Sequence, residues 1–414
     1  MSTLFGELVW DNEIYRFVFE NFYLKVQRYG TDTETFEAMI EAFLGSQKGD
    51  LPDTLMGTCY PDGHKIFFMQ LSSAGVSNNV KIISVGSYFE IKPNLNFPLH
   101  ISQITIVADE LNLIYPPSQM YSYTSNDKGM ITAMNFTSPR QSFEWKFDLS
   151  QKIVTVSSGF SHSYRWNTTP IQIQSMLHFG FEPTEDYKFV VRVFDIGQRL
   201  LQYLCYRQNI NCTDAGIYML TENGEHARIG SFSAKWMCDQ DPETEKRILE
   251  KNIPFSLVGD TMSQLLQRLS DGTLYDRHIP DNSKDERRIT PARSIMLTAA
   301  FEWEYKQIYL AGKKPTDSFM NRLIKSLNDY SDCIESFAQR VYSLNNKTYS
   351  VDAVAETIKD ARNDFAHGDI KIYYDLETLL GFVILPYLIY SMQLRAAGMS
   401  TDSIKQSIKN LFVL

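Results

Sequence analysis

The sequence contains few cysteines, no excess of positive charge and only one long apolar run. Five cysteines are scattered through 414 residues without Cys-x-x-Cys spacing, which argues against a disulfide framework and against a zinc site. The histidines of the first half, His64, His100, His162 and His178, stand singly, so no metal site and no cofactor are expected. The net charge of −9 at pH 7 is unfavourable for general nucleic-acid binding, which depends on Lys and Arg neutralising phosphates. Any contact with nucleic acid must therefore be local.

The N-terminus shows no basic region followed by an apolar run, so a secretory signal is not expected. Together with the scattered cysteines, this predicts a cytoplasmic protein. The most apolar stretch, residues 379–394, is slightly short for a membrane span and contains Gly381, Pro386 and Gln393. We interpret it as a buried helix rather than a membrane anchor.

Residues 1–270 are expected to form a β-rich domain. Pro61-Asp-Gly63 between two apolar segments predicts a hairpin. Further strands are predicted at residues 15–26, 80–85, 101–107, 130–136, 142–147, 153–156, 188–193, 217–220 and 228–232. Helices are predicted at residues 31–44, 194–208 and 260–269. The regular spacing of short strands predicts sandwich-like antiparallel sheets.

Residues 271–288 combine Gly, Pro, Asn and Ser with a dense charge cluster, and we interpret them as a linker. Helical periodicity then dominates residues 289–414, so the expected fold class is α+β. Helices are predicted at residues 290–310, 320–344, 350–367, 375–398 and from residue 400 onward. With short connections, these helices predict an antiparallel bundle.

One short motif in the helical half combines residues that suit phosphodiester chemistry. Asn363 and His367 are four residues apart and share a helix face, so the amide can orient the imidazole. Arg362 offers a planar fork of donors for a phosphate, and a histidine moves a proton near neutral pH. The reaction indicated is attack by a ribose 2′-hydroxyl on the adjacent phosphate, which makes RNA the substrate. A structural alternative is that the two cations bind carbonyls at the helix C-terminus.

The pattern Arg362-Asn363-x-x-x-His367, on the third helix of a bundle whose first helix carries Phe301-Glu302, resembles the HEPN superfamily of helical ribonucleases. The layout is similar to the ApeA-like branch, in which a HEPN domain follows a long β-rich domain in prokaryotic antiphage defence proteins. The specific match covers about residues 289–414. Over residues 1–270 the likeness rests on the layout and on stretches such as residues 55–63 and 106–111.

The resemblance implies a homodimer in which two such motifs face each other across the two-fold axis. It implies His367 as general acid or base, Arg362 as the group that stabilises the phosphorane charge, and Asn363 as the residue that positions the histidine. Glu302 matches an acidic position that supports the site. If Glu302 faces the core, Glu304 is expected to face solvent, because two residues span about 200° of a helix.

Basic residues near the bundle are candidates for a local RNA-binding rim despite the acidic net charge. The candidate substrate-binding residues are Arg287, Arg288, Arg293 and Lys306.

Two functions remain open at this stage. The first is a metal-independent endoribonuclease of abortive infection that acts on RNA, with transfer RNA as the substrate suggested by the family, and whose β-rich domain senses a phage-derived trigger or recruits substrate. The second is a non-catalytic dimerisation or binding protein. The intact Arg362, Asn363 and His367 favour the first.

Overall fold

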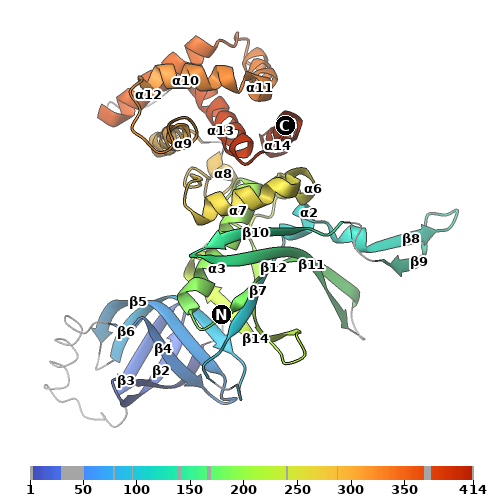
Figure 1. Cartoon of the computed structure of the whole chain (residues 1–414), viewed down its shortest axis with the longest axis vertical. Coiled ribbons are helices and arrows are strands. Elements are labelled where there is room, and N and C mark those ends of the chain that lie inside the picture. Colours follow the sequence, from blue (N-terminus) through green and yellow to red (C-terminus); the bar gives the residue numbers. More distant parts are fainter. Residues whose placement is uncertain are drawn as a thin grey trace. The chain divides into compact units, whose positions relative to one another are not determined.

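The protein is α+β, with a β-rich N-terminal region followed by a helical C-terminal region (Figure 1). The computed structural model describes residues 3–28, 51–77, 80–95, 97–137, 141–165, 169–238, 241–286, 288–367 and 374–412. The helix predicted at residues 31–44 lies outside them. Two compact units are present, and the first comprises Met1–Ile106, Gly180–Val190 and Cys212–Asp241. The second comprises Val107–Phe179, Val191–Asn211 and Pro242–Leu414.

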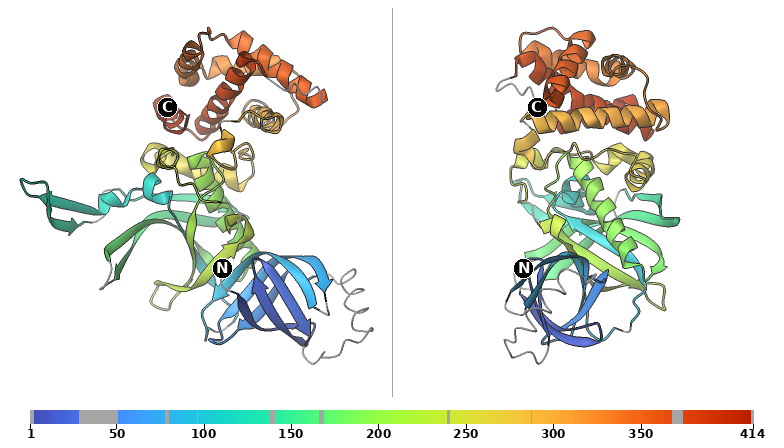
Figure 2. Two further views of the ribbon diagram at one scale, coloured as in Figure 1. Left: turned by 180° about the vertical axis from the view of Figure 1, so that it is seen from behind. Right: turned by 90° about the vertical axis from the view of Figure 1, so that its left-hand side faces the viewer.

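Six antiparallel strands of the first unit close into a barrel. They are β1 (Leu4–Trp10), β2 (Glu13–Glu20), β3 (Tyr23–Arg28), β4 (Thr54–Cys59), β5 (Lys65–Ser77) and β6 (Val80–Ile91). Their order is β6-β3-β2-β1-β4-β5, and β5 also pairs with β6, which completes the ring (Figure 2). The sandwich expected for this part is therefore wrong. Closure leaves β5 and β6 without an open edge between them.

Buried and exposed side chains alternate along the strands, and the buried ones fill the interior of the barrel. Phe17 and Phe19 of β2 point inward, and their rings lie 5.5 and 5.0 Å from the ring of Phe68 on β5. The predicted hairpin at Pro61-Asp-Gly63 is confirmed, because it joins β4 to β5 in antiparallel register. Aromatic contacts between strands make the barrel interior a single apolar core.

Two further strands of the first unit continue the sheet from the barrel strand β6. Strand β14 (His226–Ala234) pairs with β6, and β13 (Cys212–Leu220) pairs with β14. Helix α4 (Lys235–Cys238) follows β14. The strand pair predicted at residues 217–220 and 228–232 is confirmed.

The second unit contains its own strands. They are β10 (Glu144–Leu149), β11 (Lys152–Arg165) and the greater part of β12 (Thr169–Thr184), in that order, and a separate hairpin of β8 (Tyr121–Ser125) and β9 (Ile131–Phe136). The short helices α2 (Leu111–Ile114) and η1 (Pro117–Met120) precede this hairpin. Strand β7 (Ile101–Ala108) and β12 each run from one unit into the other.

Helix α3 (Tyr187–Cys205) replaces the strand predicted at residues 188–193, and that prediction is wrong. The sequence there is rich in residues that favour strands, but Phe189, Val190, Val193 and Phe194 occupy one helical face and are buried. Asp186 begins the helix, because its carboxylate accepts a hydrogen bond from the Phe189 N–H at 3.0 Å. Tertiary burial thus overrides local propensity.

Residues 242–286 belong to the second unit and carry short helices. They are α5 (Lys246–Leu249), α6 (Phe255–Val258), η2 (Gly259–Thr261), α7 (Met262–Ser270) and α8 (Ser283–Glu286). The helix predicted at residues 260–269 is confirmed. Residues 271–288 were expected to be a linker, but Leu274, His278 and Ile279 are buried. The expected boundary therefore does not coincide with the division between the units.

Six helices of the C-terminal bundle lie in the described residues after position 288. They are α9 (Pro291–Leu310), α10 (Phe319–Asp329), α11 (Ser331–Leu344), α12 (Val351–His367), α13 (Leu376–Ala396) and α14 (Thr401–Phe412). Thr290 caps α9 by accepting a hydrogen bond from the Arg293 N–H. The single helix predicted at residues 320–344 is wrong, because Tyr330 leaves the helical conformation with φ −111° and ψ 12°. The break lets α10 pack on α12 while α11 packs on α13 and α14.

Helix α13 is mostly buried, as expected for residues 379–394. It packs against α9, α11, α12 and α14. By length and composition this helix is apolar enough to cross a membrane, but 78% of its most apolar window is buried within the protein. Asp375 caps it by accepting a hydrogen bond from the Thr378 N–H at 2.8 Å.

Candidate functional site

Helix α12 carries the predicted motif on its last turns and ends at His367. Val354, Ile358 and Ala361 form the buried face that fixes the helix in the bundle. Arg362 follows Ala361 on the flank of that face and is about one third exposed, and Asn363 is exposed. Both polar side chains therefore reach the surface beside the packed face.

A carboxylate joins three helices at this site. Glu302 on α9 accepts a hydrogen bond from Arg322 on α10 at 2.9 Å through one oxygen. Its other oxygen accepts a hydrogen bond from Arg362 on α12 at 3.1 Å. Because the two arginines use different oxygens, Glu302 balances one positive charge and leaves an excess of one at the cluster.

An aromatic ring supports both arginines. The guanidinium carbon of Arg362 lies 4.9 Å from the centre of the Phe319 ring, and that of Arg322 lies 5.9 Å from it. A cation over a ring face is attracted by the negative charge of that face. Phe319 therefore restricts the orientation of Arg362, whose outward side stays accessible to an anion.

The third member of the motif is only partly described. The backbone of His367 is the last residue of α12, four residues after Asn363, but its side chain lies outside the described part of the structure. The helical spacing places the two residues on one face, as the sequence predicted. Arg287 also lies outside the described residues.

The other predicted substrate-binding residues lie in different places. Arg288 is exposed just before α9, and Arg293 on the first turn of α9 is partly buried and donates a hydrogen bond to the Tyr206 hydroxyl at 3.1 Å. Nine residues separate Arg293 from Glu302, which corresponds to opposite faces of α9. Lys306 follows Glu302 by four residues, on the same side of the helix. Helical geometry therefore groups Lys306, but not Arg293, with Glu302.

The expectation for Glu304 is wrong. Its side chain is fully buried, and its carboxylate accepts hydrogen bonds from Arg268 at 2.5 Å, from the Tyr275 N–H at 2.8 Å and from Gln393 at 2.9 Å. The exposure of Glu304 was predicted on the condition that Glu302 faces the core, but Glu302 is 30% exposed. Residues 271–288 were expected to be a linker. They instead pack against α9, where the Trp303 indole donates to the Thr273 carbonyl at 3.1 Å.

Sequence reasoning missed the pairing of Arg322 with Glu302. Arg322 is buried, with 8% of its side chain exposed. A signal was present, because Phe319 and Ser326, three and four residues from Arg322 on α10, are buried, as is the adjacent Leu323. A charged residue on an apolar helix face requires a partner of opposite charge.

The cluster can hold an anion and orient a guanidinium beside the end of α12. An arginine that is fixed by a carboxylate and by an aromatic ring loses little further freedom when it binds a phosphate.

The chain matches no family model, and no curated protein or solved structure matches it.

Proposed function

We propose that the protein is a metal-independent endoribonuclease that cleaves RNA by attack of a 2′-hydroxyl on the adjacent phosphate. The observation that carries the proposal is the bridge from Glu302 to Arg362, which fixes a phosphate-binding group one residue from Asn363 and five from His367. The resemblance of this motif to HEPN ribonucleases supplies the remainder of the proposal, including a role in antiphage defence by abortive infection.

Each residue has a chemical role in this proposal. His367 transfers a proton to or from the reacting oxygens, and Asn363 orients its imidazole. Arg362 stabilises the negative charge that develops on the phosphorane, and Glu302 keeps its guanidinium in place. A second copy of the chain supplies a second motif, so the active form is a homodimer.

The test uses the full chain and a synthetic RNA, with transfer RNA as a second substrate. In EDTA, we expect cleavage that leaves 2′,3′-cyclic phosphate ends, detected by mass spectrometry of the products. His367→Ala and Arg362→Gln should abolish cleavage while the variants stay folded dimers by light scattering. Lys409→Gln, which removes an exposed charge from α14, is the matched control and should cleave normally.

Two outcomes contradict this mechanism. Cleavage that requires an added divalent cation would rule it out, as would cleavage of an RNA whose target nucleotide carries a 2′-deoxyribose. Retained cleavage by His367→Ala would remove the proposed general acid or base.

A non-catalytic dimerisation or binding protein is the second candidate, and one observation favours it. Arg362 is already engaged by Glu302 and by the Phe319 ring, as a purely structural arginine would be. This candidate predicts that Arg362→Gln lowers dimer stability and that wild type cleaves no RNA. Analytical ultracentrifugation beside the cleavage assay separates the two.

A further inference from the structure

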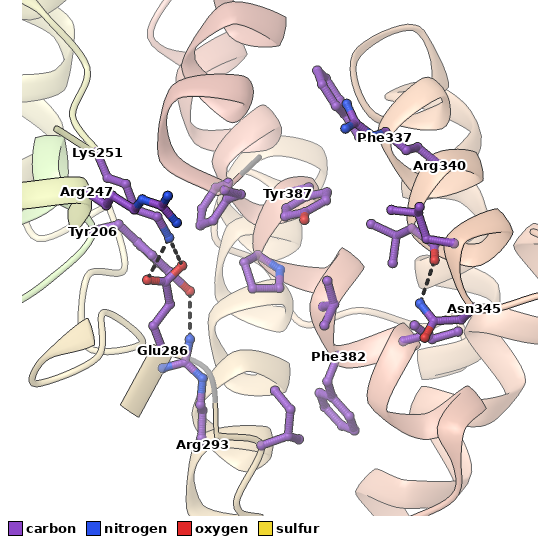
Figure 3. Close-up of a pocket in the computed structure, with 17 residues that line it drawn as sticks. Tyr206, Arg247, Lys251, Glu286, Arg293, Phe337, Arg340, Asn345, Phe382 and Tyr387 are labelled. Carbon is purple, nitrogen blue, oxygen red and sulfur yellow. Dashed lines mark hydrogen bonds and ion pairs between the residues drawn. The ribbon is translucent and has the colours of Figure 1, made fainter. Parts of the chain in front are cut away.

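A groove of about 680 Å³ lies beside α13 (Figure 3), and Glu302, Arg322 and Arg362 are not among its described lining residues. Its walls come from α9, α11, α13 and α14 and from the segments around α5 and α8, all within the second unit. Its volume is within the range of pockets that hold small organic ligands.

One part of the groove is apolar and rich in aromatic rings. Phe382 and Tyr387 come from α13, Phe337 from α11 and Phe412 from α14. The rings of Tyr387 and Phe412 lie 5.1 Å apart and are inclined at 33°. Flat apolar walls of this kind favour a ligand with a planar ring.

The remainder of the groove is cationic. Arg247, Lys251, Arg293 and Arg340 line it, and Glu286 is the one acidic residue among the described lining residues. Glu286 pairs with Lys251 at 3.1 Å, and both side chains are 17% exposed. Among the described residues, no ion pair to a carboxylate is recorded for the three arginines. A chain of net charge −9 thus concentrates unpaired positive charge here.

Arg293, which lines the groove, has a hydrogen-bond donor without an acceptor in the described part of the structure. One terminal nitrogen donates to the Tyr206 hydroxyl at 3.1 Å, whereas its Nε is buried and has no hydrogen-bond partner among the described residues. A buried guanidinium donor without an acceptor is costly, and an anionic oxygen would satisfy it. Figure 3 shows Arg293, Tyr206 and Glu286 grouped together, with Arg340 across the groove on α11.

The groove is separate from the proposed RNA site. Arg293 and Glu302 are nine residues apart on α9, which places them on opposite faces and about 14 Å apart along the helix axis. A small ligand in the groove therefore does not reach Arg362 directly.

We propose that this groove binds a small aromatic anion, in which a ring system carries a phosphate or a carboxylate. The ring packs against Phe382, Tyr387 and Phe412, and the anionic group accepts hydrogen bonds from Arg293, while Arg340 on the opposite wall adds to the positive potential of the groove. This site is additional to the proposed ribonuclease function and does not depend on it. Two sources share this chemistry, a free mononucleotide and a non-nucleotide aromatic acid.

Isothermal titration calorimetry of the full chain tests the proposal with 1-naphthyl phosphate as the probe. We expect one-to-one binding, and at least about tenfold weaker binding of 1-naphthol, which lacks the charge, and of inorganic phosphate, which lacks the ring. AMP is the second probe. Tighter binding of AMP than of 1-naphthyl phosphate identifies a nucleotide as the ligand class, and weaker binding identifies a non-nucleotide aromatic anion.

Variants locate the binding site. Arg293→Gln should weaken binding of 1-naphthyl phosphate at least about tenfold. Arg340→Gln should weaken it in the same direction, and this residue is exposed, so the variant does not threaten the fold. Lys313→Gln, an exposed cation outside the groove, and Arg362→Ala should leave the affinity unchanged.

Three results would overturn the proposal. They are no heat of binding with 1-naphthyl phosphate at millimolar concentration, equal affinity for inorganic phosphate, and a loss of affinity in Lys313→Gln as large as in Arg293→Gln. If the wild-type protein binds the probe but cleaves no RNA, the proposed ribonuclease function is contradicted and the groove proposal stands.

Discussion

Glu302 is the side chain that joins α9, α10 and α12, and its two hydrogen bonds should differ in strength. The Arg322 side chain is 8% exposed, whereas Glu302 and Arg362 are 30% and 34% exposed. A charge-assisted hydrogen bond to a buried arginine contributes about 2 kcal/mol. A pair whose partners are both a third exposed is screened by water and contributes less than about 1 kcal/mol.

Two double-mutant cycles measure this difference. Glu302→Gln with Arg322→Gln should give a coupling energy of about 2 kcal/mol, and Glu302→Gln with Arg362→Gln one below about 1 kcal/mol. Urea unfolding followed by circular dichroism supplies the free energies of unfolding. Glu302→Gln alone should lower the melting temperature by about 4–8 °C, because about 2 kcal/mol is lost in a unit of this size.

The control is Glu356→Gln, an exposed carboxylate on α12, which should be additive with Arg322→Gln. A larger coupling with Arg362 than with Arg322 would refute the reasoning, since burial would then not determine the strength of these bonds. If the protein cleaves RNA, Glu302→Gln should also slow cleavage, because Arg362 loses the carboxylate that orients it.

Two further predictions concern buried charges. Glu304→Gln should cost about 3 kcal/mol in urea unfolding, because Arg268 is left without its buried carboxylate, and a loss below about 0.5 kcal/mol would contradict this. Burial, and to a lesser extent the charge of Arg293, lowers the pKa of His278 from 6.5 to about 4. The unfolded chain therefore takes up this proton first as the pH falls, and His278 should reduce stability by about 3 kcal/mol between pH 6.5 and pH 4. His278→Phe should flatten the pH dependence of unfolding over that range, and an unchanged slope would contradict the assignment.

The candidate site was predictable in part. The position of Arg362 and Asn363 at the end of a helix followed from apolar spacing along α12 and from the glycine that follows it. The bridge to Arg322 and the burial of Glu304 did not follow, because each depends on which helices pack together. Glu302 lies 20 residues from Arg322 and 60 from Arg362 along the chain.

The sequence by itself determined the bounds of α9, α12 and α13 to within about two residues. Thr290 and Asp375 cap α9 and α13 through groups only three residues away, so the signals are local. Only the tertiary structure decided that β5 pairs with β6 to close a barrel, that residues 188–193 are helical, and that Arg293 lines a groove on the face of α9 opposite Glu302. Local hydrogen bonding and side-chain period specify an element, whereas burial against distant residues specifies its partners and the charges that they enclose.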